Sequence, residues 1–245
     1  MTKRRRIDQR LVEEGLVASR ARAADLIRRG CVTVGGAGVA KPGALVADEA
    51  AIAVAGDAGA HVSRGALKLL AALRSFGLSP HDAIALDVGA STGGFTEVLL
   101  AEGAAKVYAV DVGRAQLHER LRADKRDVSL EATDARKLNA TLVPQSVTAI
   151  VADVSFISLT LALPAALKRA APGAWLVALI KPQFEAGREA VGKGGIVRGE
   201  EDRMRAVKRV REFLEREGWE SIGVIDSPIT GGSGNVEFLI GARKR

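Results

Sequence analysis

A glycine-rich segment follows one of the apolar strands that the sequence predicts. It reads DVGASTGGF, from Asp87 to Phe95, and a helical pattern begins within it. Doubly wound α/β folds hold nucleotide-like ligands at such a strand-to-helix turn, because backbone N–H groups and the helix N-terminus face the ligand. The segment therefore predicts a nucleotide-like cofactor, and the residues expected to bind it are Asp87, Gly89, Ala90, Ser91, Thr92, Gly93, Gly94 and Phe95.

Two acids follow the next strands along the chain. Asp111 lies 22 residues after Gly89, where an acid can accept hydrogen bonds from both ribose hydroxyls. Asp134 is expected to contact the adenine amino group, and a surface acid of a loop is the alternative. The glycines lack the G-x-G-x-x-G spacing of dinucleotide enzymes, and an acid precedes them. The pattern favours S-adenosylmethionine, with NAD as the alternative.

A second pair of polar residues ends two further apolar strands. Asp153 ends the strand in VADVSF, and Lys181 ends the strand in LIKPQFE. Open α/β sheets place their active sites at the carboxyl ends of neighbouring central strands. We therefore expect Asp153 and Lys181 to face each other across a crevice, with a structural ion pair as the alternative. Asp153 is also expected to bind the cofactor.

Apolar strands and amphipathic helices alternate through residues 61–245. This alternation predicts a Rossmann-like, doubly wound α/β fold with a mostly parallel sheet between helices. The last two strands are joined by a short connection and should pair antiparallel. The predicted strands are residues 84–88, 106–110, 128–131, 147–152, 175–180, 221–225 and 236–240, and the predicted helices are residues 94–102, 115–122, 159–170 and 201–217.

The first 60 residues have a different texture and end in a linker-like stretch, AGDAGA. Apolar spacing predicts one helix at 7–14 and a second at 19–29, each followed by glycine. Short β-type pieces follow at 31–34, 39–40 and 51–54. The sequence thus predicts two domains, a small α+β domain at residues 1–60 and a larger one at residues 61–245.

Positive charge is concentrated in the N-terminal domain. Residues 1–30 hold nine Lys and Arg and four Asp and Glu, a net charge of +5, and no aromatic residue occurs before Phe76. Such a domain cannot stack bases on aromatic rings, so phosphate contacts and shape would bind a folded RNA. An acidic membrane surface or a merely solvated basic face are the alternatives. The expected RNA-binding residues are Arg4, Arg6, Arg20, Arg22, Arg28 and Arg29.

Several blocks resemble known families. The segment RRRIDQRLVEEGLVASRARAADLIRRGCVTVGGAGVAKPGALV resembles the RNA-binding module of ribosomal protein S-four. The blocks HVSRGALK, LDVGASTGGF, VYAVDVG, VADVSFISL, LIKPQFEAG and GGSGNVEFL resemble the hemolysin A (TlyA) family of ribosomal RNA 2′-O-methyltransferases, which is related to the FtsJ methyltransferases. The departures from the family pattern are His61, Ala66, Arg114-Ala115 and Asp134, and only Asp134 is a predicted cofactor contact.

The resemblance implies an activity and a catalytic set. By motif, the catalytic tetrad of the family falls on Lys68, Asp153, Lys181 and Glu237. In 2′-O-methyl transfer the sulfonium methyl is already activated, so the enzyme must align the hydroxyl and ease the loss of its proton. We expect Lys181 to lie between Asp153 and Glu237 and to stabilise charge on the 2′-oxygen, while Lys68 holds the ribose or phosphate.

The resemblance also implies cytidine in ribosomal RNA as the substrate. Because the chain stops soon after its last predicted strand, we expect the large-subunit RNA. We further expect a cytoplasmic monomer. No metal site is expected, since one Cys and three His offer no ligand spacing, and no membrane span is expected, since the apolar runs are far shorter than the roughly 20 residues that a membrane helix needs. Two alternatives remain: a catalytically inactive RNA-binding protein, and a pore-forming hemolysin as the family label suggests.

Overall fold

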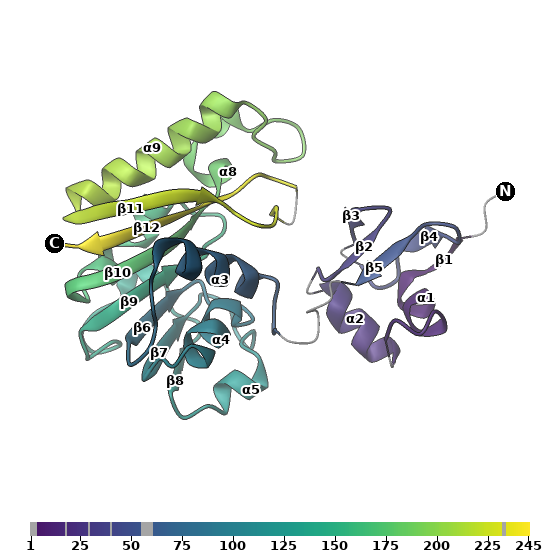
Figure 1. Ribbon diagram of the computed structural model, residues 1–245, viewed down its shortest axis with the longest axis horizontal. Coiled ribbons are helices and arrows are strands. Elements are labelled where there is room, and N and C mark those ends of the chain that lie inside the picture. Colours follow the sequence, from purple (N-terminus) through teal and green to yellow (C-terminus); the bar gives the residue numbers. More distant parts are fainter. Residues whose placement is uncertain (1–3, 18, 29, 40, 55–60, 232–233) are drawn as a thin grey trace. The chain divides into compact units, whose positions relative to one another are not determined.

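The computed structural model describes residues 4–17, 19–28, 30–39, 41–54, 61–231 and 234–245 (Figure 1). The chain divides into two compact units, Met1–Arg64 and Gly65–Arg245. The division falls four residues beyond the predicted limit at residue 60. Among the described residues, no helix is both long and apolar enough to cross a membrane.

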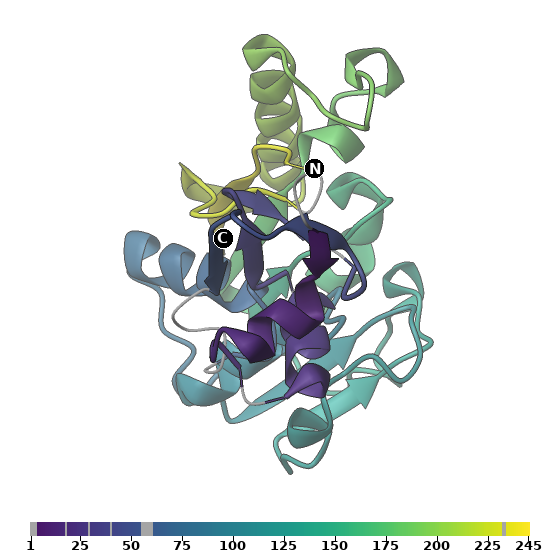
Figure 2. The same ribbon diagram turned by 90° about the vertical axis from the view of Figure 1, so that its right-hand side faces the viewer.

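The N-terminal unit packs two helices against two small sheets. The helices α1 (Ile7–Glu13) and α2 (Arg20–Arg28) lie side by side (Figures 1 and 2). Around them pack β1 (Arg4–Arg6), β2 (Val32–Val34), β3 (Ala37–Gly38), β4 (Leu45–Ala47) and β5 (Ile52–Val54). The strands β1 and β4 form one antiparallel pair, and β3, β2 and β5 form an antiparallel sheet in that order. A core of Ile7, Leu11, Ala23, Leu26, Ile27, Cys31 and Val32 joins helices and strands.

Two features of this unit differ from the prediction. The strands β1 and β4 were not predicted, because each spans only three residues, too few for a period-2 apolar pattern to stand out. The strand predicted at 39–40 lies instead at Ala37–Gly38, and residue 40 is outside the described residues. The reason is a tight turn: Gly35 and Gly36 both have positive φ, so the chain reverses within two residues and Val34 pairs directly with Ala37.

The larger unit is built on a seven-stranded sheet. Its strand order is β11-β12-β10-β9-β6-β7-β8. The five strands from β10 to β8 are parallel, and β12 is antiparallel to both β10 and β11, as predicted for the last two strands. The strand bounds are β6 (Ile84–Val88), β7 (Lys106–Val110), β8 (Asp127–Leu130), β9 (Val147–Ala152), β10 (Ala170–Ile180), β11 (Trp219–Asp226) and β12 (Phe238–Lys244).

Helices cover both faces of this sheet. One face is covered by α3 (Gly65–Phe76) and α4 (Gly94–Ala101), and the other by α6 (Leu159–Ala162), α7 (Pro164–Leu167) and α9 (Glu200–Arg216) (Figure 1). The remaining short helices are α5 (Glu119–Arg122), α8 (Pro182–Glu185), and two 3-10 turns, η1 (Ala135–Lys137) and η2 (Arg188–Ala190). The predicted doubly wound α/β class is confirmed.

Two predicted helices of this unit are shorter than expected. The helix predicted at 159–170 is divided into α6 and α7, and Pro164 starts the second helix because proline cannot donate a backbone hydrogen bond within the first. The helix predicted at 115–122 begins only at Glu119. The preceding backbone cannot be helical, because Ala115 has a φ of 52° and its N–H binds a side chain described below.

Candidate active site

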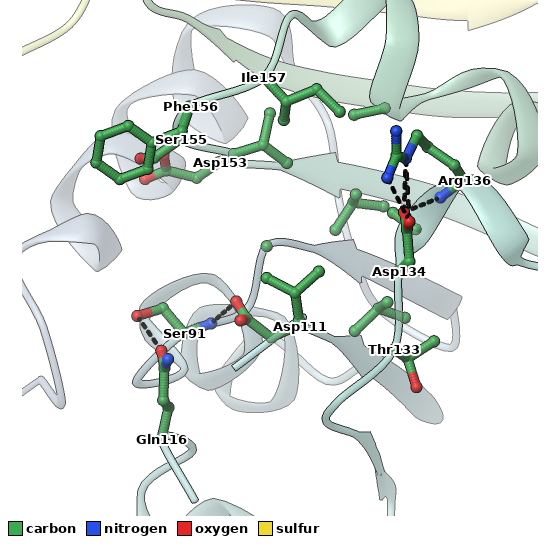
Figure 3. A pocket seen from close by; sticks show the side chains of 17 residues that line it. Ser91, Asp111, Gln116, Thr133, Asp134, Arg136, Asp153, Ser155, Phe156 and Ile157 are labelled. Atoms are coloured by element: carbon green, nitrogen blue, oxygen red, sulfur yellow. Dashed lines mark hydrogen bonds and ion pairs between the residues drawn. The ribbon is translucent and has the colours of Figure 1, made fainter. Parts of the chain in front are cut away.

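A cavity of about 400 Å³ opens at the carboxyl ends of β6, β7 and β9 (Figure 3). Because β6 has β7 on one side and β9 on the other, the strand order reverses here, and ligands of open α/β sheets bind at this point. A cavity of this volume is within the usual range for small-molecule sites. Its lining residues are Val88, Gly89, Ser91, Val110, Asp111, Val112, Gln116, Thr133, Asp134, Ala135, Arg136, Asp153, Val154, Ser155, Phe156, Ile157 and Ala162.

Glycines at two positions of the DVGASTGGF segment are required by packing. Gly89 has a φ of 88°, and a Cβ there would lie 2.5 Å from the carbonyl oxygen of Asp153. Gly93 has a φ of 98° and caps α4, and a Cβ there would overlap Leu121. The first glycine therefore lets the backbone of β6 approach that of β9 at the cavity wall, and the second lets α5 pack against the segment.

Asp111 connects two loops beside the cavity. One carboxylate oxygen accepts a hydrogen bond from the Ser91 N–H at 2.8 Å, and the other accepts one from the Gly113 N–H at 2.7 Å. The Ser91 hydroxyl in turn lies 3.3 Å from the Gln116 amide oxygen (Figure 3). Each carboxylate oxygen has a second lone pair, so Asp111 retains acceptor capacity toward a ligand in the cavity.

The loop that bears Gln116 is fixed from behind by Glu131. The Glu131 carboxylate accepts hydrogen bonds from three successive backbone N–H groups, those of Ala115, Gln116 and Leu117, at 2.6 to 3.1 Å. These hydrogen bonds, those from Leu117 and Gln116 above all, lower the pKa of Glu131. The interaction explains why residues 115–118 form a loop over the cavity instead of the predicted helix.

Asp134 lines the cavity but is already engaged. Its carboxylate caps η1 and accepts hydrogen bonds from the Arg136 side chain, the shortest at 2.7 Å (Figure 3). The hydrogen bond from Arg136 is the main cause that lowers the pKa of Asp134 to about 2. Any contact between Asp134 and a ligand amino group must therefore share the carboxylate with Arg136.

Asp87 is wholly buried and does not line the cavity. Its Oδ2 accepts a hydrogen bond from the Thr96 hydroxyl at 2.7 Å. Burial is the main cause that raises the pKa of Asp87 to about 7. The other predicted cofactor residues that do not line the cavity are Ala90, Thr92, Gly93, Gly94 and Phe95, which form the turn and the start of α4 behind it.

Four charged side chains from separate segments meet beside the cavity. The Lys68 ammonium of α3 lies 2.6 Å from Glu237 and 3.9 Å from Asp153. The Lys181 ammonium lies 2.6 Å from Asp153 and 2.7 Å from the Ser155 hydroxyl. The side chains of Lys68 and Lys181 are only 9% and 11% exposed, so both ammonium groups are held in fixed positions. Asp153 thus stands between the two lysines.

The partner of Glu237 differs from the expectation. We expected Lys181 between Asp153 and Glu237, whereas Lys68 takes the place beside Glu237. The reason is that α3 packs on β11 and β12 and buries Lys68. The sequence could not predict this burial, because the position of Lys68 on an amphipathic helix is equally compatible with a solvated side chain. The loop at Gly231 covers Glu237 from the other side, since a Cβ at Gly231 would overlap the Glu237 carboxylate.

A second cavity, of about 300 Å³, adjoins the first. Its wall includes Lys181 and Glu237, and it shares Ser155 and Phe156 with the larger cavity. Phe156 is 91% exposed, has a φ of 66°, and packs its ring against Phe184 with centroids 5.4 Å apart. The charged cluster therefore lies where the two cavities meet, with an exposed aromatic ring beside it.

Glu185 ties together the two loops that carry Asp153 and Lys181. Its carboxylate accepts hydrogen bonds from the Ser158 hydroxyl at 2.6 Å and the Leu159 N–H at 2.7 Å. Its own carbonyl accepts one from Arg209 of α9 at 3.0 Å. Glu185 is 2% exposed, and burial raises its pKa. This role could not be predicted, because in the sequence Glu185 is one more polar residue after Lys181.

The predicted RNA-binding arginines are described only in part. Arg4 is exposed on β1, and Arg6 and Arg20 both pair with the buried carboxylate of Asp8 while 45% and 56% of their side chains stay exposed. The hydrogen bond from Arg6 is the main cause that lowers the pKa of Asp8 to about 2. The side chains of Arg22 and Arg28 and the whole of Arg29 lie outside the described residues.

Sequence reasoning missed several cavity residues. Gln116, Thr133, Arg136, Ser155 and Phe156 line the larger cavity and were not predicted. Each follows within a few positions of a predicted strand end, so their place in the chain is a usable signal. Their side-chain directions depend on loop backbone with positive φ at Ser91, Ala115, Ala132 and Phe156, which no periodicity indicates.

Comparisons with known proteins agree with this geometry. The FtsJ-like methyltransferase family matches residues 61–244, and the S4 domain family matches residues 5–52. A 16S/23S rRNA (cytidine-2'-O)-methyltransferase, TlyA, from Mycobacterium tuberculosis is 47% identical over 99% of this chain and 91% of its own length. Hemolysin A from Brachyspira hyodysenteriae is 41% identical over 96% of this chain and 98% of its own.

A solved structure extends the likeness to the fold. A Streptococcus thermophilus protein that also bears the hemolysin name is 41% identical, has a TM-score of 0.77, and matches 100% of this chain and 90% of that one. The predictions of an S-adenosylmethionine-dependent methyltransferase and of its RNA-binding module are confirmed at the level of the family. This chain belongs to the FtsJ-like methyltransferase family and carries an S4 domain at its N-terminal end.

Proposed function

We propose that the chain transfers a methyl group from S-adenosylmethionine to the ribose 2′-hydroxyl of a cytidine in ribosomal RNA of the large subunit. The observation that carries the proposal is the cluster of Lys68, Asp153, Lys181 and Glu237 at the meeting point of two cavities. One cavity suits the cofactor and the other suits the target ribose. The M. tuberculosis relative named for cytidine-2'-O methylation supports the substrate class.

The larger cavity fits the cofactor in its chemistry. Asp111 offers a carboxylate for ribose hydroxyls, and the Gly89 turn brings backbone close to the site without a side chain in the way. Asp134 and Arg136 together offer an acceptor and donors at the adenine end. When bound, S-adenosylmethionine supplies a sulfonium methyl group that is already activated for attack by oxygen.

The charged cluster supplies the remaining chemistry. Lys181 is held by Asp153 and Ser155 and lines the smaller cavity, so its ammonium is placed to donate to the ribose 2′-oxygen as negative charge develops there. Asp153 is placed to take part in the loss of the hydroxyl proton. Lys68 and Glu237 keep that carboxylate and the strand ends in place. Such fixed charges need no reorganisation during the reaction.

The RNA is held at two places in this proposal. Arg4, Arg6 and Arg20 of the N-terminal unit bind phosphates, with Asp8 fixing the latter two, while residues 1–60 contribute no chemistry. In the methyltransferase unit, the exposed ring of Phe156 offers a face on which the target base can stack. All four cluster residues come from one chain, so a monomer is sufficient, and the ribosomal RNA substrate implies action in the cytoplasm.

Methylation of separated ribosomal subunits tests the proposal. The full chain is incubated with labelled S-adenosylmethionine and with small or large subunits from cells that lack the modification, and the labelled nucleotide is mapped. We expect a 2′-O-methylcytidine in the large-subunit RNA. Label in the small-subunit RNA as well would correct the subunit assignment, and label on a base or on protein would contradict the reaction.

The same preparation separates the alternative functions. RNA binding without methyl transfer would identify an inactive RNA-binding protein. Lysis of erythrocytes by the purified chain, retained in Lys181→Ala, would identify a pore-former. We expect no lysis and a loss of methyl transfer in that variant, since Lys181 lies in the wall of the ribose cavity.

A further inference from the structure

The Asp87 side chain is a buried carboxyl group with an unpaired oxygen. Asp87 is the penultimate residue of the central strand β6 and is 0% exposed. Thr96 of α4 binds Oδ2, but within the described part of the chain Oδ1 is buried and has no hydrogen-bond partner. A charged carboxylate in this position lacks both water and a full set of donors, which is costly.

Two other carboxylates surround Asp87 at the same edge of the sheet. Asp111 follows the end of β7, and Asp153 follows the end of β9, the two strands that flank β6. Both line the larger cavity, and so do Val88 and Gly89, the two residues that follow Asp87 in the chain. Asp87 itself does not line it.

Burial and the neighbouring carboxylates favour the protonated form of Asp87. Burial contributes most to raising the pKa of Asp87 to about 7, and repulsion from Asp153 and Asp111 adds to it. The hydrogen bond from Thr96 acts in the opposite direction. Asp153 is itself paired with Lys181 at 2.6 Å and with Lys68 at 3.9 Å. Near neutral pH, Asp87 is therefore divided between its two protonation states.

We propose that Asp87 selects the ligand of the cavity by charge: it gives up its proton to solvent when a cationic ligand binds, so that the site prefers S-adenosylmethionine to its uncharged-sulfur product. This inference rests on the proposed function for the identity of the ligand. The cofactor and S-adenosylhomocysteine differ by one methyl group and by the positive charge on sulfur. A negative Asp87 in a low-dielectric wall attracts that charge through space.

The same linkage favours release of the product. After methyl transfer the sulfur is neutral and the repulsion among Asp87, Asp111 and Asp153 returns. Asp87 then regains a proton from solvent, and the attraction that held the cofactor is lost. Because a cation stabilises the deprotonated form, affinity for S-adenosylmethionine should rise as the pH rises through the pKa of Asp87. Affinity for the product should change much less.

Titration calorimetry in buffers of different ionisation enthalpy tests this proton release. For the wild-type chain near pH 7 we expect a measurable fraction of a proton released per S-adenosylmethionine and close to none per S-adenosylhomocysteine. From pH 6 to pH 8, the preference for the cofactor should increase by up to about tenfold. Asp87→Asn should abolish both effects while both ligands still bind.

A matched control uses the other acid of the larger unit whose pKa burial raises to about 7. Asp127 begins β8, at the end of the sheet opposite the cavity, and both its oxygens are buried without hydrogen-bond partners among the described residues. Asp127→Asn should leave the proton release unchanged. Proton release that persists in Asp87→Asn, or that disappears in Asp127→Asn, would overturn the inference.

The proposed function and the role of Asp87 are contradicted by different results. Absence of S-adenosylmethionine binding by the wild-type chain would contradict the proposed function, and binding with no proton release would contradict the role of Asp87 alone. If Asp87→Asn does not fold, carbon-13 NMR of the wild-type Asp87 carboxyl decides. It should titrate near neutral pH in the free protein and shift to lower pH with the cofactor, and an unchanged titration would overturn the inference.

Discussion

Among the single side chains of this site, Lys181 is the one whose replacement distinguishes an active enzyme from an inactive RNA-binding protein. Asp153 and Ser155 hold its ammonium at 2.6 and 2.7 Å, and it lines the smaller cavity. An interaction made mainly in the transition state changes kcat and not ligand affinity.

Lys181→Ala should therefore lower methyl transfer to ribosomal RNA by at least about a hundredfold, the scale of losing one preorganised donor. Lys181→Arg should be nearly as inactive, because a planar fork cannot place a single charge at the same point. Binding of S-adenosylmethionine, measured by calorimetry, should survive in both. Turnover above about a tenth of wild type in Lys181→Ala would show that the reaction does not use this lysine.

Asp111 holds the loops that bear Ser91 and Gly113, and we propose that it also binds the cofactor. Asp111→Ala removes the acceptor for ribose hydroxyls and leaves the N–H groups of Ser91 and Gly113 without their present partner. We expect affinity for S-adenosylmethionine to fall by roughly 1.5–3 kcal/mol, the range for hydrogen bonds to a charged group. Calorimetry measures it, and unchanged affinity would remove Asp111 from the cofactor site.

Asp87 should also make stability depend on pH. The ordinary pKa of an aspartate is 3.8, whereas the pKa of Asp87 in the folded chain is about 7. Between these two pH values the folded state therefore binds more protons than the unfolded state. The free energy of unfolding therefore falls as the pH rises from about 4 to about 7, by an amount on the order of 4 kcal/mol at most. In Asp87→Asn this contribution is absent.

Urea unfolding at pH 5 and pH 8 compares the two proteins. The stability of Asp87→Asn relative to wild type should increase with pH, while the contribution of Asp127 is present in both and cancels. A difference between the proteins that is the same at both pH values would mean that Asp87 is ionised throughout.

Among the elements, the two loops after β9 and β10 form one rigid piece. Lys181 bonds Asp153 and Ser155, and Glu185 bonds Ser158 and Leu159, so each loop contacts the other at two points. Glu185→Ala should lower kcat by about tenfold or more by letting Lys181 move, since small displacements of aligned groups are costly. Its affinity for S-adenosylmethionine should stay within about twofold of wild type on the same argument.

The conservative variant distinguishes positioning from general damage. In Glu185→Gln the amide can still accept from Leu159 and donate to Ser158, so most of kcat should return. Ser158→Ala removes one of the two bonds and should be intermediate. Full activity of Glu185→Ala in the methylation of ribosomal subunits would show that the two loops hold their positions without Glu185.

The sequence predicts elements better than it predicts which side chains meet. The limits of β7 and β9 agree with the prediction, because apolar runs between polar residues define a buried strand locally. The start of α5 could not be predicted, since it depends on Glu131, which follows the later strand β8. Likewise, the sequence predicts that Asp87 lies at the cavity. In the structure its side chain is buried on the side of β6 that faces α4, where Thr96 binds it.

At the scale of the whole molecule, we expect phosphate binding by the N-terminal unit and methyl transfer by the larger unit to be separable. Arg4→Ala and Arg20→Ala should each weaken binding to ribosomal RNA and reduce its salt dependence by about one phosphate contact, without changing affinity for S-adenosylmethionine. Arg5→Ala is the matched control, because Arg5 pairs with two acids, Asp48 and Glu13, and its side chain is 35% exposed, whereas Arg20 pairs with one acid and is 56% exposed. Equal losses in all three variants would assign the effect to folding of the unit.

The pairing of Lys68 with Glu237 joins residues 169 positions apart, and β12, the last strand in the chain, enters the sheet between β10 and β11. A ribosome that synthesises this protein therefore exposes the N-terminal unit long before the charged cluster can close. During that interval the N-terminal unit can already fold, whereas Glu237 is not yet available to pair with Lys68. The four charged side chains can therefore meet only after β12 has been synthesised and has inserted into the sheet.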